Sequence, residues 1–124
     1  MHSLAVVLTV AAALGIIVIG GLYLLVPQRI ASTFGLPVRP EEPGETGWLN
    51  LKGVRDVVSG LVILIPLALG HPDLTGYVLL AAALTPVGDM LTILRHKGNR
   101  ALAYGMHGGT AVVVALAGVL LLVG

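Results

Sequence analysis

The 124-residue chain contains no cysteine, so it forms no disulfide and offers no thiolate as a nucleophile or metal ligand. Charge is also scarce, because Asp, Glu, Lys and Arg make up 10% of the residues against about 25% in soluble domains. The formal net charge is only +1 and no basic stripe is present, which argues against a nucleic-acid partner. The chain also lacks a phosphate loop, a dinucleotide-binding fingerprint and a nucleophile elbow.

Apolar residues make up 56% of the chain, and the mean hydropathy is +0.99. The long segments are apolar on every side, whereas a soluble helical bundle needs a polar face on each helix. We therefore expect an all-α membrane protein, in which one domain (1–124) is a bundle of four transmembrane helices running up-down-up-down. The expected spans are 4–26, 48–69, 74–94 and 101–123, with a polar loop at 28–47. The first apolar stretch has no preceding Lys or Arg and is longer than a signal-peptide core, so we expect it to be a retained span.

The basic residues are distributed unevenly between the two ends of the expected spans. Five of them occur in the first and third connections, namely Arg29, Arg39, Arg95, Lys97 and Arg100. The N-terminus, the turn between the second and third spans and the C-terminus contain no Lys or Arg. The positive-inside rule therefore predicts an integral membrane protein, in the cell membrane if bacterial, with both termini outside and the basic loops in the cytoplasm.

Three charged residues, Lys52, Arg55 and Asp56, fall inside the second expected span. The uncharged run after them, 57–69, spans only about 20 Å as a helix, whereas a bilayer core is about 30 Å thick. By the same arithmetic, Asp56, Asp89 and His107 lie about 10–12 Å from the cytoplasmic boundary on three different helices. Ionisable groups at membrane depth are costly and mark a functional site by default.

We expect a polar site in the cytoplasmic half with Asp56 or Asp89 as the acid or base, His107 as its proton-transfer partner and Arg55 as the anion stabiliser. Possible ligand-binding residues share these helix faces or this level: Lys52, Ser59, Thr92, Tyr104 and Tyr23. The alternative for each charged group is a structural ion pair or a packing histidine. Two carboxylates and an imidazole can also hold a metal ion. However, no sequence-local ligand spacing supports this, so neither a metal nor a cofactor is predicted.

One pattern of residues is familiar: Lys52-Gly53-x-Arg55-Asp56, then Gly88-Asp89, then His107-Gly108, with Phe34-Gly35-Leu36 after the first span. It resembles a largely uncharacterised family of small four-span membrane proteins found in bacteria and fungi. The resemblance covers nearly the whole chain and implies the architecture and the site location. It implies no reaction.

These observations lead to three hypotheses. The first is acid–base chemistry, such as isomerisation, cyclisation or hydration, on a lipophilic small molecule without a cofactor. The second is a proton-coupled transporter or exporter, with a homodimer as its expected form. Small multidrug exporters have a similar length and four spans, but they carry a carboxylate in the first span, which is absent here. The third is a structural or accessory protein. In each case the lipid bilayer is a partner, and no nucleic acid is expected.

Overall fold

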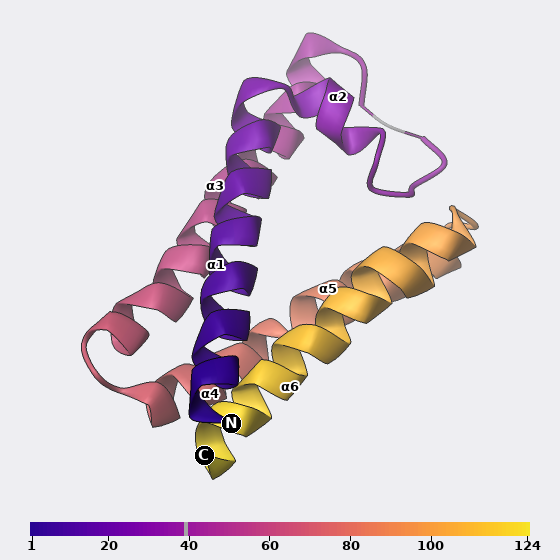
Figure 1. Cartoon of the computed structure of the whole chain (residues 1–124). Coiled ribbons are helices and arrows are strands. Elements are labelled where there is room, and N and C mark those ends of the chain that lie inside the picture. The colour runs from indigo at the N-terminus through magenta and orange to yellow at the C-terminus, as the bar shows by residue number, and fades with distance from the viewer. Residues whose placement is uncertain (39) are drawn as a thin grey trace.

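The computed structural model describes residues 1–38 and 40–124, and this part of the chain is helical without any strand. The helices are α1 (His2–Leu25), α2 (Pro27–Ala31), α3 (Pro43–Ala68), α4 (Pro72–Ala82), α5 (Leu84–Arg95), the π-helix η1 (Leu102–Gly108) and α6 (Gly109–Val123) (Figure 1). The expected all-α class is thus confirmed. Arg39, one of the basic residues used for the orientation, lies outside the described residues.

Three helical segments are long and apolar enough to cross a membrane: His2–Leu25, Pro72–Arg95 and Leu102–Val123. They identify the chain as an integral membrane protein. With 26 residues, α3 is also long enough, but any stretch of 18 residues within it contains Lys52, Arg55 and Asp56. Its N-terminus lies before the expected start at Trp48, because Pro43 occupies the first turn and Glu42 and Glu45 form a capping box.

The helices form two pairs (Figure 1). In the first pair, α1 and α3 lie side by side along their lengths. In the second pair, α4 and α5, which follow one another, lie beside α6 and η1. Both chain termini lie at the end where the pairs meet, and the pairs diverge toward the other end, where α2 and the loop after it are found (Figure 1).

Glycines allow α1 and α3 to approach closely. A Cβ atom added to Gly20 would lie 2.6 Å from the carbonyl oxygen of Gly53, and one added to Gly53 would lie 2.7 Å from the carbonyl oxygen of Gly20. Only residues without a side chain permit this spacing, as in other membrane helix pairs. Gly53 of the Lys-Gly-x-Arg-Asp motif is therefore part of the helix interface.

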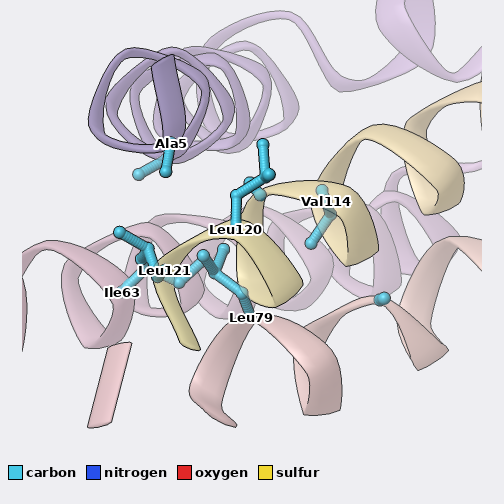
Figure 2. Close-up of a cluster of buried hydrophobic side chains, with 9 residues drawn as sticks. Ala5, Ile63, Leu79, Val114, Leu120 and Leu121 are labelled. Atoms are coloured by element: carbon cyan, nitrogen blue, oxygen red, sulfur yellow. The ribbon is translucent and has the colours of Figure 1, made fainter. Parts of the chain in front are cut away.

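The hydrophobic core lies at the end that carries the termini. Side chains of four helices meet there, among them Ala5, Ile63, Leu79, Val114, Leu120 and Leu121 (Figure 2). This cluster joins α1 and α3 to α4 and α6. The two pairs are thus held together at one end, and Lys52, Asp56, Asp89 and His107 lie toward the other.

Prolines shape the helices near the polar residues. Pro86 has no N–H group for the carbonyl of Ala82, and the expected third span is divided at Ala83 into α4 and α5. Pro27 likewise leaves the carbonyl oxygen of Tyr23 without its helical donor. The side-chain Nδ2 of Asn50 donates to that oxygen instead, at 3.0 Å, and thereby ties α3 to the end of α1.

Candidate functional site

The first part of the site lies where α3 faces the end of α1. Lys52 Nζ lies 2.6 Å from Asp56 Oδ2, one helical turn away, and 4.4 Å from the centre of the Tyr23 ring. Asp56 and Tyr23 are buried, whereas the Lys52 side chain is 30% exposed. The ammonium group is therefore held between a carboxylate and an aromatic face, both of which attract a cation.

The second part lies where α5 faces η1. Asp89 Oδ2 is 3.8 Å from His107 Nδ1, and the other ring nitrogen, Nε2, donates a hydrogen bond to the carbonyl oxygen of Phe34 at 2.8 Å. Because a carbonyl oxygen only accepts, Nε2 must carry a hydrogen. The neutral imidazole then presents the lone pair of Nδ1 to Asp89. The imidazole is buried, but 31% of the Asp89 side chain is exposed.

Phe34 connects the two parts. Its ring centre lies 4.4 Å from that of His107 and 5.5 Å from Lys52 Nζ. The structure places its ring between the Lys52–Asp56 pair and the Asp89–His107 pair. A single aromatic side chain thus joins residues from α3, α5 and η1 in one layer.

The π-helix determines which side chain of the fourth helical segment enters this layer. Tyr104 and His107, three residues apart, are expected on one face, yet Tyr104 is 60% exposed and His107 is buried. At the end of η1 the N–H of Gly109 is shared among the carbonyls of Gly105, Met106 and Tyr104, the last of which lies five residues back. This wider turn rotates each residue by a smaller angle and moves Tyr104 off the face of His107. π-Turns within α-helices are frequent at functional sites.

Four of the candidate residues point away from this network. Arg55, Ser59, Thr92 and Tyr104 are exposed. The Ser59 hydroxyl donates to the Arg55 carbonyl at 2.8 Å, and the Thr92 hydroxyl donates to the Gly88 carbonyl at 2.7 Å, so both hydroxyls are satisfied by their own helices.

The ion pair expected for Arg55 is formed by Lys52 instead. Within residues 1–38 and 40–124, Arg55 makes no ion pair. The reason is helix geometry, because residues four apart lie above one another, whereas adjacent residues such as Arg55 and Asp56 point in different directions. Lys52 and Asp56 have this four-residue spacing, so the pair is consistent with the sequence.

Phe34 and Asn50 were not among the predicted site residues. The Phe34 carbonyl is separated from His107 by 73 positions, and no local pattern reports such a contact. The contact of Asn50 could be predicted from the sequence, because a proline near the end of one span leaves a carbonyl that needs a hydrogen-bond donor from another helix.

No metal site is formed in the part of the chain that the structure describes. There, no three His, Asp or Glu side chains are grouped closely enough to hold an ion, so Asp56, Asp89 and His107 are not assembled as a ligand set. Two surface cavities, of about 420 and 570 Å³, lie beside α2 and both include Gln28 and Arg29. They are separate from the polar layer.

Comparisons with known proteins agree with the resemblance in one respect, namely that the matching family is uncharacterised. A family model described as a domain of unknown function, DUF4267, matches residues 13–121. Comparison with curated proteins and with solved structures gave no match. Because the matched region covers most of the chain, including every residue of the polar layer, this protein belongs to the DUF4267 family.

Proposed function

We propose that this protein performs acid–base chemistry on a lipophilic small molecule at the Asp89–His107 pair. In this proposal all four long helical segments cross the membrane up-down-up-down, with both termini outside and the basic loops in the cytoplasm. The observation that carries the proposal is the facing arrangement of His107 Nδ1 and Asp89 Oδ2 at 3.8 Å, with Nε2 already committed to Phe34.

This arrangement favours one shared proton. An unprotonated Nδ1 and an ionised carboxylate are both hydrogen-bond acceptors, and they would face each other without a hydrogen between them in a poorly solvated layer. One proton, on either Nδ1 or Oδ2, removes this conflict and keeps the pair neutral overall. A proton that can occupy either group is what a general acid–base pair requires.

The surroundings favour a lipophilic substrate. Asp89 is partly exposed, and the long helices around it carry many exposed apolar side chains, such as Leu84, Leu91 and Val112. A molecule that reaches Asp89 from the bilayer must dissolve in it. Lys52, also partly exposed and held by Asp56, supplies the positive charge for an anionic intermediate, a role for which the sequence alone favours Arg55.

Solvent deuterium incorporation tests the proposal without knowledge of the substrate. Isomerisation, cyclisation or hydration through C–H protonation leaves a solvent-derived hydrogen on carbon. The purified protein is placed in nanodiscs made from the total lipid extract of its expression host and from a plant lipid extract, and it is incubated in D₂O. Lipophilic products are then analysed by mass spectrometry.

The proposal predicts deuterium on carbon in at least one lipid species with the wild-type protein and with Arg55→Gln. It predicts at least a hundredfold less with Asp89→Asn or His107→Gln, since a general acid or base contributes about 10²–10⁴-fold. Incorporation that is equal in all four proteins would contradict the proposal. Proton flux into liposomes that depends on Asp89, without any deuterium on carbon, would replace it with transport.

A further inference from the structure

The loop after α2 is docked on the corner between α5 and η1. The N–H of Asn99 donates to the carbonyl oxygen of Gly35 at 2.8 Å, next to the bond from His107 to the Phe34 carbonyl. Gly35 has φ +114°, a conformation that favours glycine. A Cβ atom added to Gly98 would collide with the Gly35 carbonyl oxygen. The Phe34–Gly35 segment therefore fits this corner only in a close backbone approach.

The segment belongs to one helix pair and docks on the other. Its neighbours in the chain, α2 and α3, are associated with α1, whereas Asn99 and His107 belong to the connection and helix that follow α5. The hydrophobic core drawn in Figure 2 joins the pairs at the opposite end, where the two termini lie (Figure 1). At the end where the pairs diverge, Phe34 and Gly35 each accept a hydrogen bond from the other pair, from His107 and Asn99 respectively.

We infer that the Phe34–Gly35 segment is the positioning element of the Asp89–His107 pair, and that its docking fixes Nδ1 as the nitrogen that faces Asp89. With the segment docked, Nε2 carries the hydrogen and donates it to the Phe34 carbonyl. With the segment undocked, Nε2 has no acceptor, and the neutral ring is free to take either tautomer. Phe34 is thus a positioning residue that acts through His107. The inference rests on the proposed function only for its catalytic consequence.

The ¹⁵N chemical shifts of the imidazole nitrogens report the tautomer directly and need no substrate. The probe is the full chain, labelled with ¹⁵N-histidine, in nanodiscs at a pH well above the ordinary histidine range. The spectrum of His107→Gln identifies the His107 signals among those of the four histidines.

Two variants loosen the docked segment from opposite sides. Phe34→Ala removes the ring that covers His107, and Gly98→Ala places a methyl group against the Gly35 carbonyl while it leaves Phe34 intact. Gly15→Ala is the matched control, because a Cβ atom at Gly15 meets nothing within 4 Å. Phe34→Tyr retains the ring and is the conservative rescue.

The inference predicts a single Nε2–H tautomer in the wild type, Gly15→Ala and Phe34→Tyr. It predicts that Phe34→Ala and Gly98→Ala lower the ratio of the Nε2–H to the Nδ1–H form by about three- to tenfold, the usual effect of one hydrogen bond. An unchanged ratio in both loosened variants, or an Nδ1–H tautomer in the wild type, would overturn it. Deuterium incorporation is measured in a separate experiment. The tautomer ratio therefore tests the inference even if the proposed function fails.

Discussion

The close approach of α1 and α3 leads to a sharp prediction for Gly20→Ala. The new Cβ atom would lie 2.6 Å from the Gly53 carbonyl oxygen and 2.8 Å from the backbone nitrogen of Val57. Because both atoms belong to the backbone, no side-chain rotation relieves the clash. The helices must separate locally by 0.4 Å before the shortest contact reaches 3.0 Å, below which real Cβ contacts are essentially never found.

Overpacking of this kind costs about 1–3 kcal/mol. The adjacent glycine provides a matched control, since a Cβ atom at Gly21 meets nothing within 4 Å. Gly20→Ala and Gly21→Ala change helix propensity equally, so the difference in their free energies of unfolding isolates the clash. Gly20→Ala should be less stable than Gly21→Ala by about 1–3 kcal/mol.

Unfolding in mixed micelles, followed by the fluorescence of the single tryptophan, Trp48, measures this difference. The same experiment with Gly53→Ala tests the interface from the other helix, where the added Cβ atom would lie 2.7 Å from the Gly20 carbonyl oxygen. If Gly20→Ala is as stable as Gly21→Ala, the described approach of α1 and α3 is wrong.

Two further predictions concern polar contacts near the site. Asn50→Ala removes the donor to the Tyr23 carbonyl, which has no helical partner, and should lower the free energy of unfolding by about 1–3 kcal/mol; no loss would mean that water or another donor replaces the amide. Asp56→Asn leaves the Lys52 ammonium without its carboxylate and should cost about 1–3 kcal/mol, less than for a fully buried pair because Lys52 is 30% exposed. Arg55→Gln should stay within about 0.5 kcal/mol of the wild type in the same assay, and a larger loss than that of Asp56→Asn would show that Arg55 holds the carboxylate.

The sequence predicts the level of the polar residues in a membrane from helix rise and span length alone. The uncharged run after Asp56 is too short to cross a bilayer, and the same holds for the run before Asp89. The structure places Asp89 Oδ2 3.8 Å from His107 Nδ1, whereas the depth of these residues in a membrane stays a prediction. The helical class and the apolar helical segments were predictable for a different reason, because they depend on the long runs of apolar residues in the sequence.

The details of the site were less predictable because they depend on backbone irregularities and long-range contacts. The π-turn that separates Tyr104 from His107 has no periodic signature in the sequence. The Phe34 carbonyl reaches His107 only because Gly35 adopts a positive φ and docks against Gly98. Asp56 pairs with Lys52 and not with Arg55 because Lys52 lies four residues away on the same helix face, a spacing that is visible in the sequence.

We propose that α3 crosses the membrane and carries Lys52 and Asp56 into it. The absence of cysteine makes a direct test simple, because single cysteines can be introduced at exposed positions beyond the two ends of the apolar part of α3. Gly44→Cys lies in the first turn of α3, and His71→Cys lies just after its C-terminus. Both are treated with a membrane-impermeant maleimide in intact bacterial spheroplasts and again after permeabilisation. If α3 crosses the membrane with its C-terminus outside, His71→Cys is labelled in intact spheroplasts and Gly44→Cys is labelled only after permeabilisation. Labelling of both positions from the same side would contradict it.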